Sequence, residues 1–151
     1  MKVREIMSHP VYVVRDDATL EQAAQVMLER NVGGLPVVDA QGKLNGIVTE
    51  SDFAAKEHGV PFSTLRYPQL FGEWMSNEKI EKVYRAARSK KVSEIMTRVV
   101  AMVAEDDSVE KVLELMLRRN VNRVPVVREG IPVGIVARHD LLKLMARSIG
   151  N

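Results

Sequence analysis

The sequence predicts an α+β protein that consists of two tandem β-α-β-β-α units. Residues 3–38 align with residues 92–127, and nearly half of the aligned positions are identical. Each copy contains short β-rich runs and one amphipathic helical stripe in the same order. Because a single unit would leave an apolar face uncovered, we expect the two copies to pack together and share a core.

The first strand and first helix of each copy follow from hydrophobic spacing. The β-rich runs 11–14 and 99–103 predict the first strands. Thr19 and Ser108 are favourable N-caps for the helices that follow. Apolar residues then recur at i, i+3, i+4, i+7 and i+8, which predicts one buried helix face. This face comprises Leu20, Ala23, Ala24, Met27 and Leu28 in the first copy and Val109, Val112, Leu113, Met116 and Leu117 in the second.

The end of each copy contains a strand that leads into a helix. The segment LPVVD or VPVVR predicts a second strand, and a turn then leads to a third strand ending in GIVTESD (46–52) or GIVARHD (134–140). Packing alone does not call for a hydroxyl and a carboxylate three residues apart, as in Thr49 and Asp52. A carboxylate can accept both hydroxyls of a ribose, and a helix N-terminus favours phosphate. The alternative is that Asp52 only caps the following helix.

Residues 53–91 separate the two copies and are rich in aromatic side chains. The segment NEKIEKVYRAARSKK predicts a helix with an apolar side formed by Ile80, Val83, Tyr84 and Ala87. The aromatic residues close a small satellite core, or they form a docking surface for a partner or a second copy of the chain. They are Phe53, Phe62, Tyr67, Phe71, Trp74 and Tyr84.

Composition argues against several classes of protein. A hydrophobic content of 46% supports a folded core, and without cysteine there is no disulfide or thiol chemistry. His9, His58 and His139 are far apart in sequence, and no nucleophile–base set is visible, so we expect neither a metal site nor an enzyme. The net charge of +2 argues against a nucleic-acid binder. With no secretory signal and no apolar run of about 20 residues, we expect a cytoplasmic protein without a membrane span.

The order of motifs resembles a known family. EIM at the head, PVV in the middle and GIV followed by an aspartate at the end occur in this order twice, and each copy resembles a CBS (cystathionine-β-synthase-type) domain. The resemblance covers 3–53 and 92–142, and it implies a CBS pair packed about a pseudo-twofold axis. We therefore expect a first repeat at 1–53, an inserted helical and aromatic linker at 54–91, and a second repeat at 92–151.

The resemblance also implies a binding module with two clefts between the repeats. Such clefts commonly hold AMP, ADP, ATP or S-adenosylmethionine, with the motif aspartate on the ribose hydroxyls. Arg123 is the expected phosphate contact in the first cleft. The implied first site comprises Thr49, Asp52, Thr97, Val100, Asn122, Arg123 and Val124. The implied second site comprises Ser8, His9, Val11, Gly33, Gly34, Leu35, Arg138, His139 and Asp140.

The second site departs from the pattern, because Ala137 replaces the threonine and Gly34 replaces the arginine. We therefore expect the first site to be the more complete one. The expected function is a regulatory sensor of an adenine nucleotide (AMP, ADP or ATP) that acts on a separate effector protein or through a homodimer, with no catalytic cofactor. The alternatives are a dimerisation or adaptor module with the aromatic insert as its docking surface, or a sensor of S-adenosylmethionine or a dinucleotide.

Overall fold

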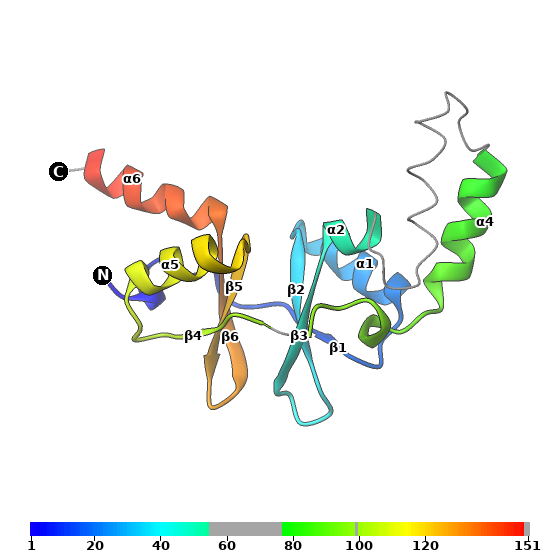
Figure 1. Ribbon diagram of the computed structural model, residues 1–151, viewed down its shortest axis with the longest axis horizontal. Coiled ribbons are helices and arrows are strands. Elements are labelled where there is room, and N and C mark those ends of the chain that lie inside the picture. Colours follow the sequence, from blue (N-terminus) through cyan, green and yellow to red (C-terminus); the bar gives the residue numbers. More distant parts are fainter. Residues whose placement is uncertain (55–76, 99, 150–151) are drawn as a thin grey trace.

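The computed structural model describes residues 1–54, 77–98 and 100–149. Two three-stranded sheets, ordered β1-β2-β3 and β4-β5-β6, stand side by side, with helices toward one end of the sheets and hairpin turns at the other (Figure 1). In each sheet the first strand is parallel to the second, and the second is antiparallel to the third. The predicted α+β class and the predicted β-α-β-β-α order are therefore confirmed.

The two halves have matching elements. The first half contains η1 (Val3–Glu5), β1 (Val14–Arg15), α1 (Leu20–Arg30), β2 (Gly34–Val38), β3 (Leu44–Thr49) and α2 (Glu50–Ala54). The second half contains η3 (Val92–Glu94), β4 (Val103–Ala104), α5 (Val109–Arg119), β5 (Arg123–Arg128), β6 (Ile131–Ala137), η4 (Arg138–Leu141) and α6 (Leu142–Ile149). Helix α4 (Asn77–Arg88) precedes η3.

The first strand of each half is shorter and later than its β-rich run predicts. β1 begins at Val14 and β4 at Val103, so most of 11–14 and 99–103 lies outside the sheets. The chain before each strand crosses from the other half of the molecule, and it pairs only at single bridges, Ser8 with Ile135 and Thr97 with Ile47. The predicted strand extents were wrong because a residue is held in a sheet only where a neighbouring strand is available for hydrogen bonding.

The head of each repeat packs in the core of the opposite half. Val3 and Ile6 are fully buried in the second half's core, and Val92 and Ile95 are fully buried in that of the first. Backbone hydrogen bonds hold both heads, since the N–H of Val3 donates to Asp107 and the N–H of Val92 donates to Ala18. The N-terminus accordingly lies beside α5 (Figure 1). Each core is thus completed by residues from the other repeat.

The first helix of each half has the predicted cap and a narrower buried stripe than predicted. The N–H of Gln22 donates to the Thr19 hydroxyl at 3.2 Å, and the N–H of Lys111 donates to the Ser108 hydroxyl at 3.3 Å. Leu28 and Leu117, expected in the buried face, are instead 82% and 84% exposed. With 3.6 residues per turn, the last position of the stripe lies roughly 100° from the centre of the buried face, beyond the edge of a three-stranded sheet.

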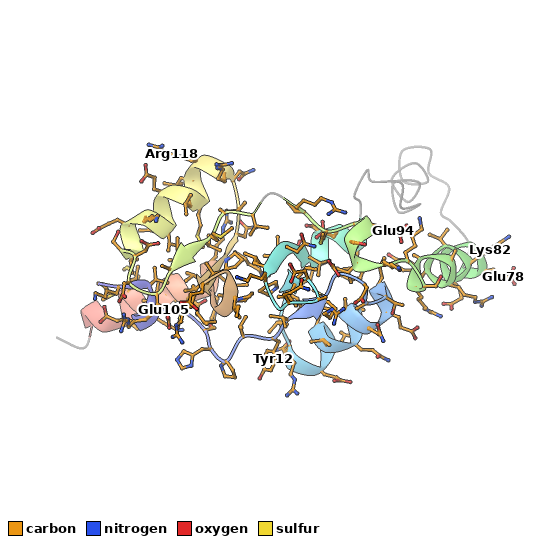
Figure 2. All side chains as sticks on the ribbon, turned by 90° about the horizontal axis from the view of Figure 1, so that it is seen from below. Tyr12, Glu78, Lys82, Glu94, Glu105 and Arg118 are labelled. Carbon is orange, nitrogen blue, oxygen red and sulfur yellow. The ribbon has the colours of Figure 1, made fainter. Side chains whose placement is uncertain are left out.

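The predicted helix of the insert is present as α4. Ala87 is part of the core of the first half, and Val83, Tyr84 and Phe53 pack against that core. Figure 2 shows Glu78 and Lys82 at the outer end of the molecule, pointing away from this core. Phe62, Tyr67, Phe71 and Trp74 lie outside the described residues, so the docking role of the aromatic insert stays a prediction.

Candidate functional site

The junction between β3 and α2 places Thr49 and Asp52 together. Asp52 is 1% exposed, and its Oδ2 accepts a hydrogen bond from the N–H of Thr49 at 2.7 Å and from the Thr49 hydroxyl at 3.5 Å. The Thr49 and Ser51 hydroxyl oxygens are 2.9 Å apart. The alternative that Asp52 is the N-cap of the following helix is wrong, because α2 begins at Glu50 and Asp52 lies inside its first turn. Its carboxylate instead bonds back to the N–H of Thr49, the residue just before the helix.

A cavity of about 680 Å³ lies between the two halves at this junction. It is bounded on one side by the end of β3 and on the other by the turn that leads into β5. Backbone hydrogen bonds between Ile47 and Thr97, at 2.9 and 3.0 Å, hold the two halves together beside the cavity. Four predicted residues of the first site line it: Thr49, Thr97, Asn122 and Arg123.

The lining also differs from the prediction. Val124 is fully buried in the second half's core, so only its backbone could reach a ligand, and half-buried Val100 is not part of the lining. Asp52 is buried and is not part of the lining, but its carboxylate bonds to the lining residue Thr49. The lining residues that sequence reasoning missed are Ile47, Glu50, Ser51, Asn120 and Val121. Each lies within three residues of a predicted one, so adjacency in sequence was the available signal.

The Arg123 side chain extends from the first cleft across Gly34, the first residue of β2, and Gly33 just before it. A Cβ built on Gly34 would lie 2.9 Å from the Arg123 Cδ, so this side chain needs the glycine. A Cβ built on Gly33 would clash with both the Arg123 guanidinium and the Glu50 carboxylate. The two charged groups therefore lie close together beside Gly33, where the first cleft meets the neighbouring groove that Glu50 also lines.

The second cleft is much smaller, at about 190 Å³. Of the predicted residues, Ser8, His9, Val11, Gly34 and Leu35 line it, with additional lining from Pro10, Tyr12, Val32, Pro36 and Ile135. The other four are not part of its lining. Gly33 borders a different groove, Arg138 and His139 are exposed, and Asp140 is buried. Figure 2 shows Tyr12 beside α1, and the Arg30 guanidinium lies 4.8 Å from its ring centre.

The carboxylate of Asp140 is engaged by groups of the protein itself. Asp140 Oδ1 accepts hydrogen bonds from the Ser8 hydroxyl at 2.7 Å and from the Lys143 ammonium at 2.8 Å, while Oδ2 accepts from the N–H of Ala137 at 2.8 Å. Lys143 also donates to the carbonyl of Ile6 at 2.8 Å. The residue aligned with Lys143 in the first copy is Ala55, which has no charge to offer. In the second copy the charge of the motif aspartate is thus paired with an ammonium group of the protein itself.

Two further observations concern the described part of the chain. Within it, no group of three or more histidine, aspartate or glutamate side chains is placed to hold a metal ion. Among its helices, none is long and apolar enough to cross a membrane.

Comparison with known families assigns the class of protein. The family model of the CBS domain matches residues 3–59 and 92–147. These two matches cover well over half of the chain, so the protein belongs to the CBS domain family and contains a pair of such domains. CBS-pair proteins are generally ligand-sensing regulatory modules, and stand-alone pairs are typically non-catalytic.

Individual relatives have different lengths. The chain is 31% identical to uncharacterized protein MJ1426 of Methanocaldococcus jannaschii, with 96% of this chain and 91% of that protein covered. It is 26% identical to the chloroplastic CBS domain-containing protein CBSX1 of Arabidopsis thaliana, covering 88% of this chain and 58% of that protein. It also matches inosine-5′-monophosphate dehydrogenase of M. jannaschii at 32% identity, but covers only 23% of that enzyme.

Solved structures give the same fold. The CBS domain of a CBS domain containing membrane protein from Sphaerobacter thermophilus is 40% identical, with a TM-score of 0.76 and coverage of 95% of this chain and 87% of that one. The CBS domain pair of protein MJ0100 is 28% identical, with a TM-score of 0.71 and 98% coverage of both chains. That pair was solved in complex with 5′-methylthioadenosine and S-adenosyl-L-methionine.

Proposed function

We propose that the first cleft binds an adenosine-containing ligand and that the CBS pair acts as a ligand sensor for a separate partner or within a homodimer. The cavity of about 680 Å³ between the halves carries this proposal, because hydroxyl, amide and guanidinium groups line it together. The candidates are the adenine nucleotides AMP, ADP and ATP, S-adenosylmethionine, which the MJ0100 pair holds, and a dinucleotide.

The chemistry of the lining suits a nucleoside. The Thr49 and Ser51 hydroxyls can bond ribose or phosphate oxygens, and the Asp52 carboxylate that holds Thr49 in place is an acceptor of the kind a ribose hydroxyl needs. Arg123 can contact an anionic group on the 5′ side. A ligand that contacts both halves shifts their relative geometry only by the difference in its affinity for the two arrangements. Contact with both halves is therefore what would make the site a sensor.

Cavity size favours the first cleft over the second. Small-molecule sites usually enclose about 300–1,000 Å³. The first cleft, at about 680 Å³, falls in this range, whereas the second, at about 190 Å³, is below it. Occupation of the second cleft would also require a ligand to compete with Lys143 and Ser8 for Asp140. We propose a single high-affinity site per chain.

Thermal unfolding with added ligand tests the proposal. AMP, ADP, ATP, 5′-methylthioadenosine or S-adenosylmethionine, at about 100 times its dissociation constant, should add about 2.7 kcal/mol of stability. Asp52→Asn should remove most of the ligand-induced increase in melting temperature, whereas the matched change Asp140→Asn should leave most of it. Each increase is measured relative to the same variant without ligand, so a change in basal stability does not affect the comparison. No increase with any of these ligands would refute the proposal.

A second function is favoured by a separate groove of about 850 Å³ between α1, α2 and α4. Leu20, Phe53 and Tyr84 contribute apolar surface to it, and Glu21 and Glu81 lie at its border. Such a groove suits an adaptor that binds a partner protein. In that case the ligands above would leave the melting temperature unchanged.

The homodimer rests on exposed apolar residues at equivalent positions. Leu28 on α1 and Leu117 on α5 are aligned in the two repeats and are exposed to almost the same degree. A pair of equivalent patches related by pseudo-twofold symmetry suits a symmetric contact with a second copy of the chain. We propose that these two helix faces form the dimer contact.

A further inference from the structure

Glu50 lies in the wall of the first cleft although it is not one of the residues predicted for the first site. It is the first residue of α2, between Thr49 and Ser51, and it lines both the cleft and the neighbouring groove. Glu50 and Arg123 are the charged residues in the lining of the cleft. The aligned residue in the second repeat is Arg138, so the carboxylate is particular to the first motif.

Glu50 and Arg123 present opposite charges at one place. The glycines at 33 and 34 leave room for both side chains, since a Cβ on Gly33 would overlap each charged group. The N–H of Glu50 donates to the carbonyl of Gly33 at 3.1 Å, so the backbone of α2 is anchored at this point. An anchored backbone limits how far the carboxylate can move from the guanidinium.

We propose that Glu50 and Arg123 form a two-charge recognition end that selects nucleosides whose 5′ substituent carries both an ammonium and a carboxylate. This inference rests on the proposed function of the first cleft. Arg123 would bind the carboxylate through parallel hydrogen bonds, and Glu50 would accept from the ammonium. An amino-acid group carries its ammonium and its carboxylate on the same carbon atom, which matches the closeness of the two side chains.

The same arrangement disfavours polyphosphates. A triphosphate can satisfy Arg123, but its negative charges then lie beside the Glu50 carboxylate. At a separation of about 6 Å in a water-like medium, each like-charge pair weakens binding by roughly threefold. Salt reduces this effect, because Glu50 is exposed to solvent. AMP should therefore bind more tightly than ATP, and a zwitterionic nucleoside more tightly than either.

A matched pair of ligands isolates the recognition end. S-adenosylhomocysteine and 5′-methylthioadenosine share the adenosine and the thioether, and only the first carries the amino-acid group. Isothermal titration calorimetry should show that S-adenosylhomocysteine binds the full-length protein more tightly. Glu50→Gln should narrow this preference by roughly fivefold, the upper range for an exposed ion pair, and should tighten ATP binding. Glu110→Gln is the control, because it makes the same charge change at an exposed position of α5 that is not part of the cleft lining.

The outcomes separate this inference from the function on which it rests. If the ligands bind but Glu50→Gln leaves both the preference and the ATP affinity as they are in Glu110→Gln, the recognition end is refuted and the nucleoside site stands. Tighter wild-type binding of ATP than of S-adenosylhomocysteine would also refute it. If no nucleoside binds the wild-type protein, both the function and the inference are wrong.

Discussion

Asp52 and Asp140 show how two aligned residues acquire different surroundings. Each accepts a hydrogen bond from the backbone N–H three residues earlier, at 2.7 and 2.8 Å, so their local roles are the same. Asp140 additionally receives the ammonium of Lys143 and the hydroxyl of Ser8. Asp140→Asn removes the negative charge that pairs with the Lys143 ammonium. Asp52→Asn carries no corresponding cost from an aligned lysine, because the first copy has Ala55 at that position.

Asp107 provides a test of pH dependence. The N–H of Ala104, followed by the ammonium of Lys111, lowers the pKa of the Asp107 carboxyl from its usual value. A lowered folded-state pKa stabilises the protein above the unfolded pKa of about 3.9, and this contribution is lost as pH falls through the lower folded value. Asp107→Asn should therefore reduce the free energy of unfolding by about 1 kcal/mol at pH 7.

Urea unfolding at a series of pH values from about 7 to about 2 measures this contribution. The difference between Asp107→Asn and wild type should shrink toward the acidic end, where the wild-type carboxylate becomes protonated. A difference that stays constant over this range would show that the charge of Asp107 is not what stabilises the turn.

Helices α1 and α5 follow their sequence pattern in position, in cap and in most of the buried face. The exceptions, Leu28 and Leu117, occupy equivalent exposed positions. Periodicity placed both leucines in the buried face, and this prediction was wrong, because the three-stranded sheet is too narrow to cover the edge of the stripe. An apolar residue at the edge of a stripe can serve either the core or an interface, and spacing alone does not distinguish the two.

Substitution of both leucines tests the proposed dimer contact. Leu28→Glu combined with Leu117→Glu should convert the dimer to a monomer in sedimentation velocity experiments, because like charges would meet across the contact. The free energy of unfolding of the monomer should change by no more than about 0.5 kcal/mol, since both side chains are exposed.

Lys82→Glu on α4 is the control for added negative charge, because this residue points outward at the far end of the molecule (Figure 2). It should leave the dimer intact. An unchanged sedimentation coefficient in the double variant, relative to wild type, would rule out these helix faces as the contact.

The exchange of repeat heads makes the two halves one cooperative unit. Ile6 and Ile95, each fully buried in the opposite half, should both be sensitive to truncation. Ile6→Ala and Ile95→Ala should each lower the free energy of unfolding by about 2–5 kcal/mol, as deletion of core methyl groups does. Calorimetry should still show a single transition, because unfolding of one half exposes the head that completes the other.

Val13→Ala serves as the comparison, because Val13 lies in the connection between the halves and is 39% exposed. Its effect should be well below that of either isoleucine. Two separate calorimetric transitions in Ile6→Ala would indicate halves that unfold independently.

The sequence alone determined the repeat, the order of elements, both helix caps and the family resemblance, and it named four residues that line the first cleft. These features depend on spacings of a few residues, which the geometry of helices and strands converts directly into neighbours. The tertiary structure alone decided the exchange of heads, the unequal volumes of the clefts, the pairing of Ser8 and Lys143 with Asp140, and the meeting of Glu50 with Arg123. Most of these contacts join residues far apart in the chain, and they form only where the packing of the two halves brings their surfaces together.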